Sequence, residues 1–140
     1  MSMQICVLSD TPLNSIAEWQ EAINAERFPL RLSLDRPLNE VSGFLPALLE
    51  NKATGFECHH VKSTELTETY PDVDFHQEWR YVLAFVWGGN FEEMRATWMA
   101  AVSYARATAG VVFDEEAGKV LTALEAFQVV QDMRRRHAAI

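Results

Sequence analysis

The chain has 140 residues, of which 49% are hydrophobic and 23% are charged. This composition excludes an intrinsically disordered chain and is typical of one folded domain, here residues 1–140. No apolar run approaches the roughly 20 residues of a membrane-spanning helix, so no membrane partner is expected. The 20 acidic and 12 basic residues give a net charge of −8. Such a charge repels the phosphates of nucleic acids and attracts a basic protein.

The first predicted strand, Met3–Leu8, begins close to the N-terminus. No basic residue precedes its apolar positions, and Asp10 follows soon after, so the segment lacks the pattern of a secretory signal. The two cysteines, Cys6 and Cys58, both fall in predicted strands. We therefore expect a cytoplasmic protein with reduced, buried thiols rather than a disulfide.

A capping box formed by Ser15 and Glu18 predicts the first helix, because the cap oxygen accepts a hydrogen bond from the first turn. Strands rich in branched and aromatic residues are expected next, at Leu30–Leu34, Phe44–Leu49 and Gly55–Val61. Pro46 has no N–H to donate to a ladder. It therefore predicts that its strand lies at a sheet edge.

The polar segment Ser63–Gln77 is the longest irregular stretch and has room for one short helical turn. The strand that follows, Trp79–Trp87, is apolar on both faces, which indicates a central strand covered on both sides. A long loop of the same chain is the expected cover for its second face, and a partner is the alternative. In that alternative, a homodimer would cover the face of Trp79, Tyr81 and Phe85.

Two further capping boxes predict the last two helices, after Asn90 and after Thr122. Between these helices, Gly110–Asp114 and Lys119–Leu121 are expected to form a pair of short strands. Strands clustered between helices favour an α+β fold. We expect a largely antiparallel sheet of about six strands with three helices packed on it.

Cys58 and His60 lie two residues apart on a predicted strand, so their side chains project to the same face. With His76 from the following loop they would supply three ligands of a zinc site, and Asp72, Asp74 or water would supply the fourth. The same cysteine and histidines are candidates for a thiol nucleophile with its base. A buried thiol beside a core histidine is the simpler interpretation, because no Cys-x-x-Cys or His-Glu-x-x-His spacing accompanies them.

The pair Gly88-Gly89 leads into a predicted helix, a geometry that can hold a phosphate through free N–H groups. Glu92 and Glu93 in the first turn would repel a phosphate, and no lysine follows the glycines as in a P-loop. A nucleotide site is therefore not expected.

Acidic residues gather in the long loop before the central strand, with aromatic residues beside them. The predicted partner-binding residues are Glu65, Glu68, Tyr70, Asp72, Asp74, Glu78, Trp79 and Trp87. Exposed carboxylates would meet Lys and Arg of a basic protein, and the aromatic side chains would anchor it. A carboxylate acid–base pair would instead need one of the acids in an apolar pocket.

Two stretches carry a resemblance to known proteins. Gly43–Glu57 resembles the strand–turn–strand of small acidic bacterial proteins, and Ala107–Asp114 with Gly118–Thr122 looks like their C-terminal part. Some proteins of this sort are similar to the immunity proteins encoded beside secreted bacterial toxins. The resemblance implies an inhibitor that masks a toxin, and it assigns no functional residue.

The sequence therefore favours a non-enzymatic binding protein, most concretely an immunity-type inhibitor of a bacterial toxin that acts through an acidic surface. Such a protein needs no cofactor. The alternative is a small metal- or thiol-dependent enzyme that uses Cys58, His60 and His76, with zinc as the candidate metal.

Overall fold

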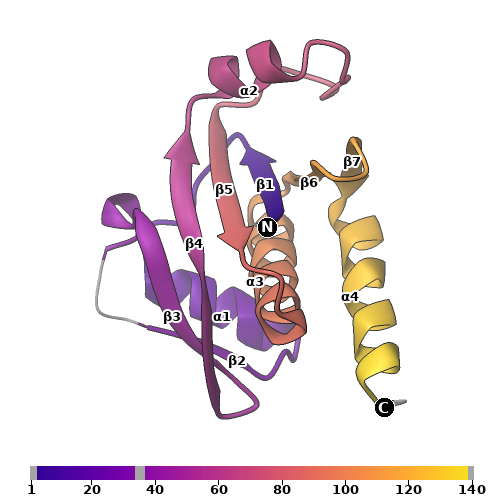
Figure 1. Ribbon diagram of the computed structural model, residues 1–140. Helices are drawn as coiled ribbons and strands as arrows, with labels where there is room; N and C mark the ends of the chain where they lie inside the picture. The colour runs from indigo at the N-terminus through magenta and orange to yellow at the C-terminus, as the bar shows by residue number, and fades with distance from the viewer. Residues whose placement is uncertain (1–2, 34–36, 139–140) are drawn as a thin grey trace.

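The computed structural model describes residues 3–33 and 37–138. Within these ranges a seven-stranded antiparallel sheet carries four α-helices, which confirms the α+β class with one strand and one helix more than expected (Figure 1). The elements are β1 (Met3–Ser9), α1 (Ile16–Ala25), β2 (Leu30–Leu32), the 3-10 turn η1 (Leu38–Glu40), β3 (Gly43–Leu49), β4 (Lys52–Val61), α2 (Ser63–Thr69), β5 (Tyr81–Trp87), α3 (Phe91–Thr108), β6 (Val111–Asp114), β7 (Lys119–Thr122) and α4 (Ala123–Ala138). The predicted end of the second strand, Leu34, lies outside the described residues.

The three predicted helix caps are present. The side-chain oxygens of Ser15, Asn90 and Thr122 each accept from backbone N–H groups of the following turn, at 2.7–3.2 Å. The reciprocal bond of a full capping box forms only at Thr122, whose N–H donates to Glu125 at 3.0 Å. In the other two helices the glutamate accepts from the N–H of Asn14 or Gly88 instead, and so ties the preceding loop to the helix.

The strand order is β2-β3-β4-β5-β1-β6-β7, so β5 occupies the predicted central position. The edge position predicted from Pro46 is wrong, because β3 lies between β2 and β4. The edge strand β2 is short and pairs only with Ala47–Leu49, and Ser33 donates to the carbonyl oxygen of Pro46 at 3.1 Å. The nitrogen of Pro46 therefore faces the end of this short strand, just past its last ladder pair.

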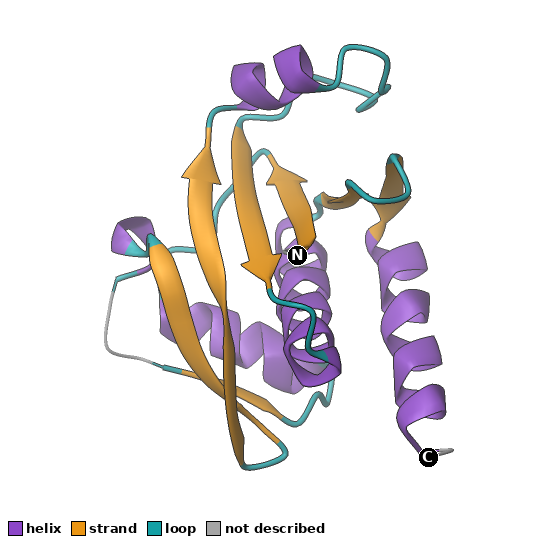
Figure 2. Ribbon diagram, viewed as in Figure 1, coloured by secondary structure: helices purple, strands orange, loops and turns teal. Residues whose placement is uncertain are grey.

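One face of the sheet packs against α1 and α3, with α4 beside α3 and the β6–β7 hairpin (Figure 2). Trp19 of α1 lies at the centre of this core and touches the rings of Phe56, Phe85 and Tyr104. From β5, Leu83 and Phe85 are buried in the same layer. Among the described residues, no helix has both the length and the apolar character to cross a membrane.

The second face of the sheet is partly covered by α2 and by the loop of residues 70–80, which confirms the expected cover by the chain itself. Val82 and Ala84 of β5 form a small second core with Leu66, Phe75 and Phe113. Trp79 belongs to this second core, where its indole N–H donates to the carbonyl oxygen of Phe75 at 2.8 Å. Since Phe85 is buried on the opposite side, Trp79, Tyr81 and Phe85 do not form the single exposed face that a homodimer was expected to use.

Candidate functional site

The structure does not bring Cys58, His60 and His76 together. Cys58 is buried on the helix-covered face, and His60 projects from the same side of β4 toward the carbonyl oxygen of Leu38, 3.2 Å from its Nε2. His76 lies in the loop that crosses the opposite face, where its ring is exposed and 3.8 Å from Asp74. Among the described residues, no group of three or more His, Cys, Asp or Glu side chains is arranged to hold a metal ion.

Both thiols are held in their neutral form. Burial raises the pKa of Cys58 far above its ordinary value. Burial, reinforced by the nearby carboxylate of Glu115, raises the pKa of Cys6 to about 12. Because the thiolate is the nucleophilic and metal-binding form of cysteine, neither residue is prepared for thiol chemistry.

We expect neither Cys6 nor Cys58 to react with an aromatic disulfide reagent in the native protein at neutral pH, while both react in denaturant. Prompt labelling of Cys58 in the native state would contradict this placement. Since the thiols take their ordinary pKa of 9.0 only after unfolding, the free energy of unfolding should fall as the pH rises above that value. Chemical denaturation at pH 7 and at high pH measures this slope.

The predicted partner-binding residues divide into two groups. The acids Glu65, Glu68, Asp72, Asp74 and Glu78 are exposed on α2 and on the loop over the second face. The aromatic residues are not free anchors. Trp87 is buried in the main core, Trp79 is half-buried, and Tyr70 packs edge-on against Phe113. Tyr70 also donates its hydroxyl to Glu115, and this hydrogen bond is the main cause that raises the pKa of Tyr70 to about 12.

An apolar groove of about 570 Å³ lies on the outer face of β2, β3 and β4, where α2 and its loop do not reach. Phe44 and Leu48 line it with 58% and 40% of their surface exposed, and Pro46 lies between them on the same side. The ring of Phe44 rests on Gly55 so closely that a Cβ there would lie 2.4 Å from it. Arg31 and Glu93 also line it, and Glu57 pairs with Phe44 across the ladder.

Sequence reasoning missed this groove, although β3 carried a signal for it. Leu45, Ala47 and Leu49 alternate on the buried face, and the intervening positions are also apolar. Only one face of a strand near the sheet edge needs to be apolar for folding, so the second apolar row was available as a hint of an interaction surface.

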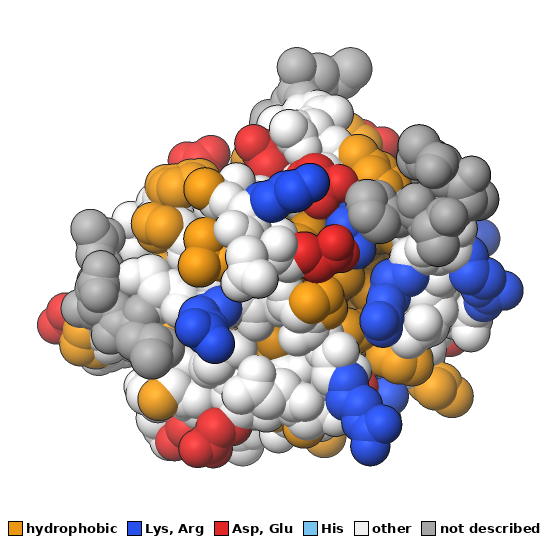
Figure 3. All heavy atoms as spheres, turned by 90° about the horizontal axis from the view of Figure 1, so that it is seen from below, with side chains coloured by type: hydrophobic (Ala, Val, Ile, Leu, Met, Phe, Trp, Pro, Cys, Tyr) orange, Lys and Arg blue, Asp and Glu red, His pale blue; other side chains and the backbone are white. Residues whose placement is uncertain are grey.

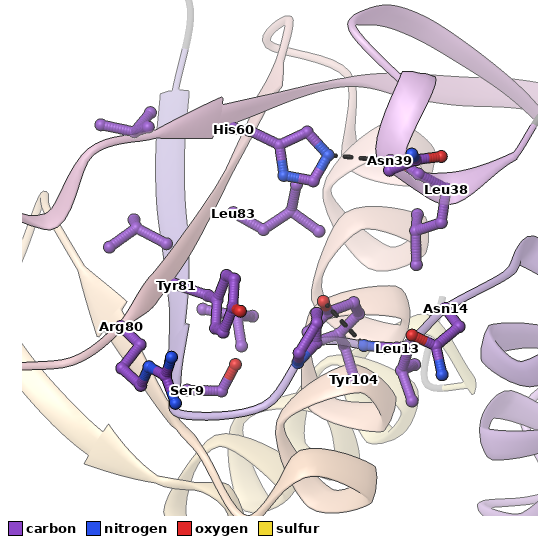
Figure 4. A pocket seen from close by; sticks show the side chains of 14 residues that line it. Ser9, Leu13, Asn14, Leu38, Asn39, His60, Arg80, Tyr81, Leu83 and Tyr104 are labelled. Atoms are coloured by element: carbon purple, nitrogen blue, oxygen red, sulfur yellow. Dashed lines mark hydrogen bonds between the residues drawn. The ribbon is translucent and has the colours of Figure 1, made fainter.

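A second cavity of about 400 Å³ lies where β1 and β4 end and β5 begins (Figure 4). Its lining comes from β1, the loop before α1, η1, β4, β5 and α3. Val7, Leu38 and Leu83 are buried and form an apolar floor, while His60 and Tyr81 stand at the exposed opening. Of these residues, the sequence singled out His60 as a metal or thiol candidate and Tyr81 as part of the face that a homodimer would cover.

Both hollows suit binding, because each combines apolar surface with polar groups near its opening. Seen from below, hydrophobic side chains gather in patches between separated acidic and basic groups (Figure 3).

Comparisons of the chain with models of protein families, with curated proteins and with solved structures found no match.

Proposed function

We propose that the protein is a non-enzymatic binding protein that docks a basic protein partner in the groove of β2–β4, as an immunity-type inhibitor of a bacterial toxin would. The observation that carries this proposal is the exposure of Phe44 and Leu48, which lie on one apolar strand face with Pro46 between them. Exposed apolar side chains gathered on one surface are the usual centre of a protein interface, with polar groups at the rim.

Charge supports a basic partner over a second copy of the chain. Two copies would each carry a net charge of −8 and would repel one another. Glu57 and Glu93 beside the groove would meet Lys or Arg of a partner, and Arg31 would meet one acidic residue. The exposed acids of α2 and the following loop would add to the field that steers a basic protein toward the molecule.

The alternative, a metal- or thiol-dependent enzyme that uses Cys58, His60 and His76, has less support from the geometry. A thiol mechanism needs an accessible thiolate, and the Cys58 thiol is buried and neutral. A zinc site needs converging ligands, and His76 lies across the sheet from Cys58 and His60. Binding is therefore the function that the geometry supports best.

We expect Phe44→Asp and Leu48→Asp each to weaken the complex at least roughly thirtyfold, because each places a charge at the centre of the apolar contact. The first partner to test is the toxin-sized product of a reading frame next to this gene, with affinity measured by calorimetry and protection by growth on co-expression. Higher salt should slow association with the wild type.

Leu124→Asp is the matched control, because Leu124 is 70% exposed on α4, away from the groove. This variant should bind within about twofold of wild type, as expected for a substitution outside the contact. The proposal fails if the groove variants bind their partner as tightly as wild type. It also fails if the wild type forms a stable dimer that the Phe44 substitution dissociates.

A further inference from the structure

The second cavity, which His60, Tyr81 and Tyr104 help to line, has the size and construction of a small-molecule site. Its volume of about 400 Å³ lies within the range of ligand pockets. Its floor is made of side chains from the sheet and from η1, with Val7, Leu38 and Leu83 almost completely buried. These residues are packed from several elements, so the cavity is already formed without a ligand.

The lining of this cavity has the opposite charge character to the rest of the chain. The chain has 20 acidic residues in 140, yet none of the 14 residues that line the cavity is acidic. Arg80 stands at the opening with its guanidinium 5.9 Å from the centre of the Tyr81 ring, and it forms no ion pair with a described carboxylate. The neighbouring Asp10 accepts instead from the backbone N–H of Arg80 and from the side chain of Gln77.

Hydrogen-bond donors without protein acceptors face the same space. The hydroxyl oxygen of Tyr104 accepts from the N–H of Leu13 at 3.1 Å, and no described residue accepts the hydroxyl hydrogen (Figure 4). Tyr104 is only 3% exposed and lines the cavity, so the cavity is where a bound molecule can offer an acceptor for this hydrogen. The amide side chains of Asn14 and Asn39 add further donors at the opening (Figure 4).

We propose that this cavity binds a small carboxylic acid with an apolar body. The body lies on the floor formed by Leu38 and Leu83, and the oxygen atoms of the ligand accept from Arg80 and from the other donors of the lining. A carboxylate fits better than a cation or a neutral apolar molecule, because the lining supplies an arginine and several donors and no acidic side chain. This inference is independent of the protein-binding proposal.

The test uses the whole chain, labelled with 15N, and phenylacetate as the probe, with neutral phenylacetamide as its uncharged match. We expect saturable shifts of the amide signals of Val7, Tyr81 and Leu83, with phenylacetate binding at least about tenfold more tightly than the amide. Arg80→Gln should weaken phenylacetate binding by roughly tenfold or more and leave the amide unchanged. Arg136→Gln on α4 removes the same charge at an exposed site and should leave both affinities within about twofold.

Tyr104→Phe is a second variant, expected to weaken phenylacetate binding severalfold at an unchanged fold, as judged by circular dichroism. The proposal is overturned if acid and amide bind alike, if Arg80→Gln has no effect, or if the shifted signals lie outside the cavity. The absence of saturation in the low millimolar range overturns it as well. Phe44→Asp should leave phenylacetate binding unchanged, so this test and the test of protein binding fail separately.

Discussion

Replacing Trp19 by alanine is expected to lower the free energy of unfolding by roughly 3–5 kcal/mol, the range measured for large aromatic residues in protein cores. Trp19 has no exposed surface and lies edge-on to three rings, with centroid distances of 5.5 Å to Tyr104, 5.8 Å to Phe85 and 6.3 Å to Phe56. Its indole N–H also donates to the carbonyl oxygen of Ala100 at 2.9 Å, which joins α1 to α3. Such a loss is a large part of the stability of a small domain.

Urea denaturation followed by circular dichroism measures this effect. Trp19→Phe should cost less than Trp19→Ala, because it keeps an aromatic ring and loses chiefly the hydrogen bond and part of the volume. Leu124→Ala serves as the control, because Leu124 is 70% exposed and its truncation should change stability by less than about 0.5 kcal/mol. A Trp19→Ala protein as stable as this control would show that α1 does not anchor the core.

Replacing Phe75 by alanine is expected to release the cover of the second sheet face, at a cost of roughly 3 kcal/mol. Phe75 is buried against the ring of Phe113, with 5.0 Å between centroids. Its backbone carbonyl oxygen also accepts from the indole N–H of Trp79, which links Phe75 to the end of the loop. Apolar contact at this point therefore attaches the middle of the loop to the sheet, as Tyr70 attaches its start through Phe113.

The two cysteines report this release on opposite faces of the sheet. Cys6 lies in the same small core as Phe75, whereas Cys58 lies in the main core. Phe75→Ala should therefore make the Cys6 thiol reactive while Cys58 stays protected, as thiol labelling and mass spectrometry would show. Simultaneous labelling of both thiols would mean global unfolding instead, and unchanged protection of Cys6 would mean that the loop is held elsewhere.

Local signals in the sequence determined the helix starts and the central strand. The side chains of Ser15, Asn90 and Thr122 cap their helices because a cap acts within one turn of its own residue. The two apolar faces of β5 predicted its central position, because a strand is apolar on both sides only when both are covered. The edge predicted from Pro46 was wrong. The neighbouring strand β2 is so short that its ladder ends before Pro46, so no partner there needs the N–H that proline lacks.

The candidate sites depended on contacts between distant parts of the chain. The pattern placed Cys58 and His60 on one face of β4 correctly, because alternation along a strand is local. It could not place His76, because the path of that loop is set by the burial of Phe75 against Phe113 across the sheet. Likewise, burial in the main core removed Trp87 from the predicted anchors.

The sequence by itself determined the α+β class, the acidic charge and the capped helices, all of which follow from composition or from residues within a few positions of each other. Tertiary structure alone decided the groove and the cavity. Tyr104 meets the N–H of Leu13 across 91 positions of sequence, and Phe44 stays exposed because the loop over the second face does not reach β3. The second apolar row of β3 indicated an apolar surface, but how the layers pack decides whether other elements cover it.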